Sequence, residues 1–204
     1  MCWNKEVSML TFIIAITGCI YLYYRNNNND RWVALFGGTI AMIQLAEYFM
    51  WSNQSCNDIN KLASMLALLV LVLEPAMNMI GGMIFEKSYS DRKILKVLLL
   101  SYIVYVIAIY LSIKEKQIKW CGHKSRESCH LRWDFLDIFS SKWSILWVIF
   151  LMLPILTMNP KYQGIILFAI GLMTFILSKI HHTSVMGSMW CWYAILVIYA
   201  KIII

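Results

Sequence analysis

Two glutamates stand within long apolar stretches of the sequence. Glu47 lies in the run QLAEYFMW, and Glu74 is followed directly by Pro75 in the run LALLVLVLEPAMNMIGG. Helix rise places Glu74 near the middle of the bilayer. A charged side chain there costs about 2.5 kcal/mol or more, so such residues usually face a bundle interior or an aqueous cavity. Pro75 cannot donate a hydrogen bond to the carbonyl of Leu71, and Asn78 lies one helical turn after Glu74. These residues predict a bent, polar spot in one helix.

Other polar residues are predicted in the outer half of the membrane, above Glu74. Gln44 and Glu47 share a helix face at i and i+3, and Ser184 and Ser188 share one at i and i+4. We therefore predict an intramembrane polar cavity with Glu74 at its floor, lined by Gln44, Glu47, Glu74, Asn78, His181, His182, Ser184 and Ser188. A chamber of this kind is typical of a transporter or channel for protons, cations or a small solute.

Two other functions fit the same residues. In a structural or membrane-remodelling protein, the buried carboxylates would only fix helix packing, and Ser184-x-x-x-Ser188 would let two helices approach closely. In an intramembrane lipid hydrolase, Ser184 and His181 would form the reactive pair. The sequence has no G-x-S-x-G motif, and two adjacent histidines do not converge on one zinc ion. We therefore predict no catalytic residue and no cofactor.

Cysteines and histidines gather in the segment 114–142, which contains Cys121-Gly-His123 and Cys129-His130. Two thiols and two imidazoles are ligands that zinc accepts, but this spacing matches no standard zinc finger. Disulfides form where the compartment is oxidising. We predict a disulfide among Cys56, Cys121 and Cys129, with the pairing left open, and no metal site.

The composition places these residues in a membrane protein. Of 204 residues, 60% are hydrophobic and 14% are charged, and the mean hydropathy is +0.64. A span needs about 20 mostly apolar residues. We predict an all-α polytopic transmembrane bundle, a single domain over 1–204, with spans at residues 7–24, 32–51, 62–85, 93–113, 143–158, 164–180 and 184–204. The fifth and sixth spans are the shortest, so six spans with one re-entrant segment is the alternative.

The connections carry their own signals. Asp30 is expected to cap the second helix, and the asparagine run at residues 26–29 is expected to be a flexible connector. Lys201, near the end of the last span, is expected to extend toward the membrane surface. In the segment 114–142, four apolar residues would share one helix face, namely Leu131, Phe135, Ile138 and Phe139. This pattern predicts a short helix that lies along the membrane interface.

Basic residues in the short connections predict the orientation. With seven spans, the amino-terminal side has three such residues, which are Lys5, Lys61 and Lys179. The opposite side has Arg25, Arg31, Lys87, Arg92, Lys93, Lys96, Lys161 and Lys201. The positive-inside rule then places the amino terminus outside or in a lumen and the carboxy terminus in the cytoplasm. Four cysteines, namely Cys2, Cys56, Cys121 and Cys129, fall on the predicted outer side, in agreement with this orientation.

The net charge of +7 does not indicate a nucleic-acid partner, because the Lys and Arg residues are divided between two sides of a membrane. The expected partners are the lipid bilayer and a small ion or solute. The expected location is an endomembrane or the plasma membrane, with a viral or host membrane as the alternative.

Three short motifs are similar to a pattern in one group of proteins. They are Gln44-Leu-Ala-Glu47-Tyr48 with Trp51, Glu74-Pro75 with Asn78, and Gly187-Ser188-Met-Trp190-Cys191. In these motifs the chain resembles uncharacterised polytopic membrane proteins of large DNA viruses and algae. The resemblance implies a multi-pass membrane protein and brings no activity with it.

Overall fold

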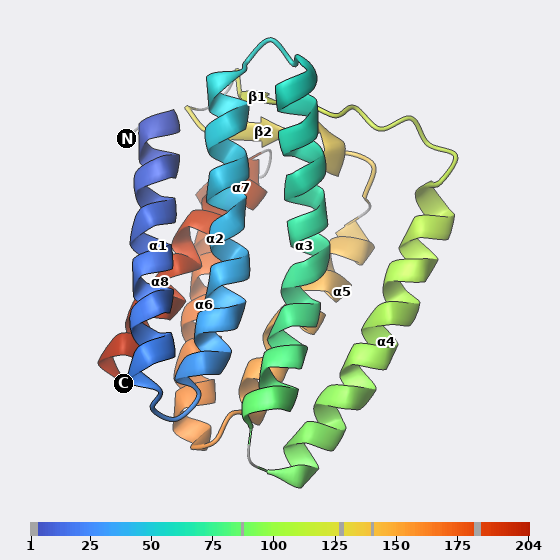
Figure 1. Ribbon diagram of the computed structural model, residues 1–204. Coiled ribbons are helices and arrows are strands. Elements are labelled where there is room, and N and C mark those ends of the chain that lie inside the picture. The colour runs from blue at the N-terminus through green and yellow to red at the C-terminus, as the bar shows by residue number, and fades with distance from the viewer. Residues whose placement is uncertain (1–3, 87, 127–128, 140, 182–184) are drawn as a thin grey trace.

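The computed structural model describes residues 4–86, 88–126, 129–139, 141–181 and 185–204, and it shows a helical bundle with one short hairpin (Figure 1). The long helices of the first half are α1 (Lys5–Arg25), α2 (Asp30–Ser52), α3 (Asp58–Phe85) and α4 (Tyr89–Ile113). Next come β1 (Gly122–Lys124), β2 (Leu131–Trp133) and the 3-10 turn η1 (Asp134–Leu136). The second half consists of α5 (Ser141–Met152), the 3-10 segment η2 (Leu153–Thr157), α6 (Lys161–His181), α7 (Met186–Tyr193) and α8 (Ile195–Ile203).

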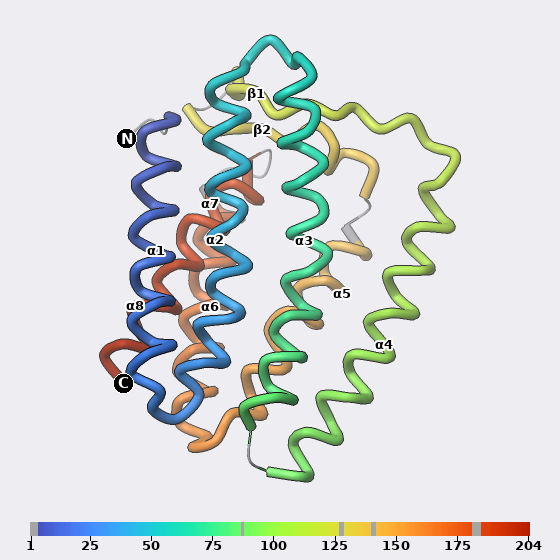
Figure 2. Tube along the Cα trace, in the orientation of Figure 1, coloured from blue at the N-terminus to red at the C-terminus, as the bar shows by residue number. Residues whose placement is uncertain are grey.

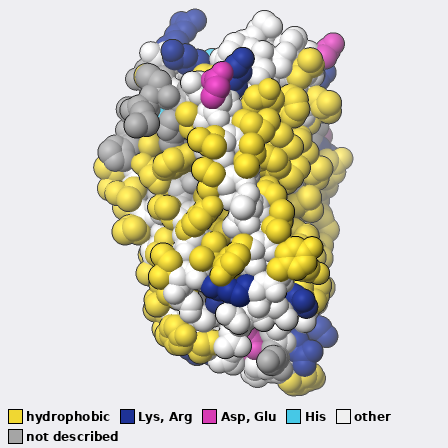
Figure 3. Space-filling model, turned by 60° about the vertical axis from the view of Figure 1, so that its left-hand side comes forward, with side chains coloured by type: hydrophobic (Ala, Val, Ile, Leu, Met, Phe, Trp, Pro, Cys, Tyr) yellow, Lys and Arg dark blue, Asp and Glu magenta, His cyan; other side chains and the backbone are white. Residues whose placement is uncertain are grey.

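Within the described residues, six helical segments are long and apolar enough to cross a membrane. They are α1, α2, α3, α4, most of α6, and α7 taken together with α8. Figure 3 shows hydrophobic side chains over the middle of one face, with charged side chains near its two ends. The prediction of a helical bundle with several helices long and apolar enough to span a membrane is confirmed at this level.

The helices pack in two layers beside one peripheral helix. In Figures 1 and 2, α1, α2 and α3 lie side by side in front of α6, α7 and α8. Helix α4 stands at the edge and diverges from the bundle toward the hairpin. Of the six candidate spans, α2 has the largest buried share and α4 the smallest, so α2 is central and α4 is mostly surrounded by lipid in a bilayer. We call the end with β1 and β2 the hairpin end and the end with residues 26–29 the asparagine end.

Two predicted spans are interrupted. The fifth, at residues 143–158, is α5 followed by η2, because Pro154 cannot donate the helical hydrogen bond and the chain tightens into a 3-10 segment. The seventh, at residues 184–204, divides at Ala194 into α7 and α8, and its first residue lies outside the described chain. The seven-span count stays a prediction.

The short interfacial helix predicted at residues 130–139 is wrong for its first part, and the helical part of this described segment is only the 3-10 turn η1. Residues Leu131–Trp133 form strand β2, which pairs antiparallel with β1. Leu131 and Trp133 are buried and Arg132 between them is less so, which is the two-residue period of a strand. The side chain of Asn60 holds β1 in place, since its Oδ1 accepts from Gly122 N at 2.9 Å and its Nδ2 donates to Gly122 O at 2.7 Å.

A disulfide joins Cys56, between α2 and α3, to Cys121, just before β1. The prediction of a disulfide among the three cysteines is therefore confirmed. Cys129 is not a free thiol, and the free thiols of the described chain are Cys19 and Cys191.

The asparagine run is a defined turn and not a flexible connector. Asn26 and Asn29 both have positive φ, at 53° and 63°, a region that asparagine tolerates better than most residues. The Asn29 side chain donates from Nδ2 to Asn159 O at 2.8 Å, which ties the turn to the segment before α6.

Asp30 does not occupy the capping position of α2, which belongs to Asn29. The carboxylate of Asp30 instead pairs with Arg25 Nε at 2.7 Å and with Lys201 Nζ at 3.2 Å. Lys201 is 1% exposed, so it does not extend toward the surface as expected. Its ammonium group also donates to Gln163 Oε1 at 3.0 Å, and these polar contacts hold α8 against α1, α2 and α6.

Candidate functional site

A group of buried polar side chains lies at the centre of the bundle. Gln44 and Glu47 come from α2, Glu74 from α3, and Ser188 and Cys191 from α7. All five are buried. We call these five residues the polar cluster.

The polar cluster has unfilled hydrogen-bonding capacity. In the described chain, both polar atoms of the Gln44 amide, both Glu47 carboxyl oxygens, Glu74 Oε1 and Ser188 Oγ have no hydrogen-bond partner. In folded proteins, most buried polar side-chain atoms have a partner, and an exception needs an explanation such as a bound water, ion or ligand. Several exceptions in one place therefore mark a candidate binding site.

The members of the polar cluster are close enough to act together. Ser188 and Gln44 are the polar side chains next to the Glu47 carboxyl group, although their atoms lack hydrogen-bonding geometry toward it. The Cys191 thiol lies within electrostatic range of both Glu47 and Glu74. Helix α7 thus brings the two glutamates, which belong to different helices, into one site.

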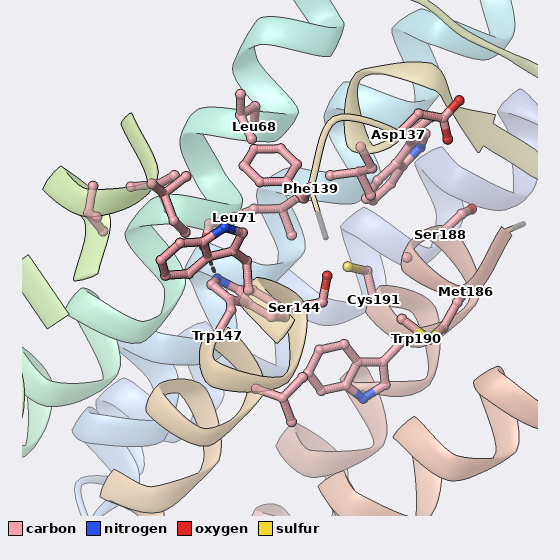
Figure 4. Close-up of a pocket in the computed structure, with 18 of the residues that line it drawn as sticks. Leu68, Leu71, Asp137, Phe139, Ser144, Trp147, Met186, Ser188, Trp190 and Cys191 are labelled. Carbon is pink, nitrogen blue, oxygen red and sulfur yellow. Dashed lines mark hydrogen bonds between the residues drawn. The ribbon is translucent and has the colours of Figure 1, made fainter. Parts of the chain in front are cut away.

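Next to the polar cluster is a cavity of about 570 Å³, bounded by α3, α4, α5, α7 and the β2–η1 segment (Figure 4). Its lining is mostly apolar, and its aromatic members are Tyr102, Tyr105, Tyr110, Trp133, Phe139, Trp143, Trp147, Phe175 and Trp190. We call it the aromatic cavity. A volume of this size is typical of sites for small molecules.

Hydrogen bonds fix several of these rings. Pro75 leaves the carbonyl of Leu71 without its helical donor, and Trp147 Nε1 donates to this oxygen at 2.8 Å. The Tyr102 hydroxyl donates to Val72 O at 2.7 Å, one residue further along α3. The Tyr105 hydroxyl donates to Trp143 O at 2.7 Å. The proline of α3 thus provides the acceptor that fixes Trp147 of α5, and the two tyrosine hydroxyls attach α4 to α3 and to α5.

The rings also pack on one another. The ring centroids of Trp147 and Trp190 are 5.5 Å apart, and those of Phe175 and Trp190 are 5.1 Å apart, both in edge-to-face arrangements. Such pairs stabilise each other beyond the area they bury. The indole N–H groups of Trp133 and Trp190 are buried without a hydrogen-bond partner in the described structure.

Two residues belong to both the polar cluster and the aromatic cavity. Ser188 and Cys191 line the cavity, and Figure 4 shows them on α7 near Trp190. Gln44, Glu47 and Glu74 are not among the lining residues. The cavity is therefore apolar over most of its wall, with polar groups of α7 and the buried carboxyls beyond them at one side.

The predicted cavity residues fall into three sets. The structure brings together Gln44, Glu47, Glu74 and Ser188. Asn78 serves the packing, since its Oδ1 accepts from Trp32 Nε1 at 2.7 Å and its Nδ2 donates to Leu151 O at 2.8 Å. His182 and Ser184 lie outside the described residues, and His181 ends α6 with a side chain that the structure does not describe.

Sequence reasoning missed the aromatic wall. Tyr102 and Tyr105 stand at i and i+3 in α4, which was treated as an ordinary apolar span. Their spacing on one face of an otherwise aliphatic helix was the available signal. Pro75 predicts that the carbonyl of Leu71 lacks its helical donor. The sequence does not show that Trp147 supplies the replacement hydrogen bond.

The hairpin end has a second group of donor atoms. The sulfurs of Cys56 and Cys121 and a ring nitrogen of His123 lie within 4.8 Å of one another. His123 Nδ1 is also 3.6 Å from Asp134 Oδ2. The disulfide uses both sulfurs, so this group serves to hold the hairpin on the bundle.

No family model, curated protein or solved structure matches the chain. The resemblance to viral and algal membrane proteins therefore stays a prediction, and the site is interpreted from its chemistry alone.

Proposed function

We propose that this protein is a multi-pass membrane carrier that binds a small amphiphilic solute within the bilayer. The apolar part of the solute would occupy the aromatic cavity, and its polar group would meet the polar cluster. The seven spans, with the hairpin end outside or in a lumen, belong to the same proposal.

The observation that carries this proposal is the position of Ser188 and Cys191, which belong to the polar cluster and also line the aromatic cavity. An apolar chamber with a few polar groups at one side is the usual form of a site for a small molecule. Ser188 Oγ has no partner and lines the cavity, so it can bind the polar group of the solute directly, with the unfilled groups of Gln44 and Glu47 behind it.

The position of α4 suggests how the solute would enter. This helix forms one wall of the aromatic cavity, diverges toward the hairpin end, and is attached beside the cavity through the Tyr102 and Tyr105 hydroxyls (Figure 1). A solute dissolved in the bilayer would reach the cavity between α4 and α5. Movement of α4 would open and close this route.

A binding assay tests the proposal. The protein is placed in phosphatidylcholine nanodiscs, and energy transfer from tryptophan to a neutral probe, a dansyl group on a decyl chain, is measured. Val106→Trp fills the cavity from α4 and should weaken probe binding about tenfold, which corresponds to about 1.4 kcal/mol.

The control is Val104→Trp, which adds the same ring on the same helix at a position that is 67% exposed and outside the cavity. It should bind the probe as the natural protein does. Equal binding by both variants, or no saturable binding at all, would contradict the proposal.

A structural role is the second candidate, favoured by the way Asn78 connects α2, α3 and α5. If the polar cluster only fixes packing, Glu47→Gln and Glu74→Gln would change thermal stability and leave the affinity for every solute, neutral or charged, unchanged.

A further inference from the structure

The side chains in and around the aromatic cavity include more acidic groups than basic ones. Among the residues that line it, Asp137 is the one charged side chain, and its carboxylate pairs with Arg132 Nη2 at 2.7 Å. Beyond the α7 side of the cavity lie Glu47 and Glu74, and neither forms an ion pair in the described structure. Burial without a partner favours the neutral form of a carboxyl group, whereas a cation that enters this site stabilises the carboxylate, so binding of a cation would release a proton.

The walls favour a cation as well. Tyr102, Tyr105, Trp143, Trp147 and Trp190 all line the cavity, and their ring faces carry partial negative charge. Aromatic-lined sites are a common means of holding quaternary ammonium groups, which are too weakly hydrated to oppose transfer from water strongly. A neutral or anionic polar group gains less from such walls.

We infer that the solute is a lipophilic organic cation, an ammonium group with an apolar body. This inference rests on the proposed function and names the class of its substrate. The ammonium group lies at the Ser188 and Cys191 side, where the two carboxyls act on it, and the apolar body fills the space among the rings. An ammonium that carries N–H groups also donates a hydrogen bond to the free Ser188 Oγ, which lines the cavity.

Competition among three compounds with the same chain tests this inference. The neutral dansyl probe is bound in uncharged phosphatidylcholine nanodiscs and is displaced by decyltrimethylammonium, decanol or decanoate. We expect the cation to displace the probe at a concentration about tenfold lower than decanol, and decanoate to be the weakest.

Two sets of variants then test whether the glutamates of the polar cluster cause the preference for the cation. In the double variant Glu47→Gln with Glu74→Gln, the cation should lose most of its advantage over decanol, measured as the ratio of the two displacing concentrations in the same variant. Glu6→Gln, which removes an exposed carboxylate of α1, is the matched control and should keep the full preference. The thermal unfolding midpoint of each variant is measured in the same nanodiscs.

The outcomes separate the two proposals. Equal displacement by the cation and decanol in the natural protein overturns the inference and leaves the carrier proposal intact, and this comparison needs no variant to fold. A preference that survives in a folded double variant also overturns it. If none of the compounds displaces the probe, and Val106→Trp and Val104→Trp behave alike, the carrier proposal itself fails.

Discussion

At the scale of single residues, the carbonyl that Pro75 leaves without a donor fixes a side chain on another helix. Leu71 O accepts from Trp147 Nε1, so a break in the hydrogen bonding of α3 becomes a contact between α3 and α5. Asn78 connects the same two helices one turn past the proline by donating to Leu151 O. The polar features of α3 therefore include both a candidate for function and supports for the structure.

The hydrogen bond from Trp147 to the Leu71 carbonyl can be tested by removing its donor. Trp147→Phe should lower the free energy of unfolding by about 1–3 kcal/mol, because the Leu71 carbonyl would be left buried without a partner. The comparison is with Trp143→Phe, since Trp143 lines the same cavity and its indole N–H makes no hydrogen bond in the described structure. Denaturant unfolding in mixed micelles measures both. If the two substitutions cost the same, the hydrogen bond does not matter for stability.

Some of the site could be predicted from residue types alone. Gln44 and Glu47 must share a face because of their spacing, and the depth of Ser188 follows from its position in the last span. The pairing of Asp30 with Lys201 could not be predicted, because these two residues lie far apart in the sequence and meet only when α8 packs against α1 and α2. Local capping signals are weaker than a buried ion pair of this kind.

At the scale of elements, small residues allow α8 to approach α1 and α2. A Cβ atom added to Gly37 would lie 2.7 Å from Cγ1 and 2.9 Å from Cδ1 of Ile198, a buried side chain of α8. Ile198 is β-branched and has few alternative rotamers, so α8 itself would have to move. The close approach of these helices therefore depends on the absence of a side chain at Gly37.

Two adjacent glycines make this a controlled comparison. Gly37→Ala should destabilise the protein by about 1–3 kcal/mol through overpacking. Gly38→Ala meets no atom within 4 Å and should be neutral or stabilise α2 by about 0.5–1 kcal/mol. Unfolding midpoints in detergent give the answer, and Ile198→Ala should restore part of the loss in Gly37→Ala. Equal effects of the two alanines would show that the α2–α8 contact is looser than described.

The long helices were predictable because their apolar runs are long and their connections are polar, as in α2 and α3. The short strand that follows α4 was not predictable in the same way. The strand at Leu131–Trp133 depends on pairing with β1, which Asn60 and the disulfide hold from outside the segment. An apolar run of that length fits a helix or a strand, and tertiary contacts decide between them.

At the scale of the whole molecule, the two ends of the bundle differ in chemistry. The hairpin end holds the disulfide, and the asparagine end holds the buried ion pairs of Asp30 and the carboxy terminus (Figure 1). The segment 114–142 contains seven basic residues, so counting it reverses the contrast to ten basic residues at the hairpin end against eight at the other, and the positive-inside rule holds only when this long loop is left out. The disulfide is therefore the stronger indication of which end faces the oxidising side.

We predict that the amino terminus faces the outside or a lumen and that the carboxy terminus faces the cytoplasm. Epitope tags at the two termini test this in cells treated with digitonin, which opens the plasma membrane and leaves internal membranes closed. When the protein is in an internal membrane, antibody should reach the carboxy-terminal tag after digitonin and the amino-terminal tag only after full permeabilisation.

In the same cells, Cys56 and Cys121 should resist alkylation until a reductant is added, because a disulfide placed on the lumenal side is not exposed to cytosolic glutathione. The reverse staining pattern, with both cysteines reactive at once, would place the hairpin end in the cytoplasm. The route proposed between α4 and α5 would then open toward the other leaflet, because α4 diverges from the bundle at the hairpin end.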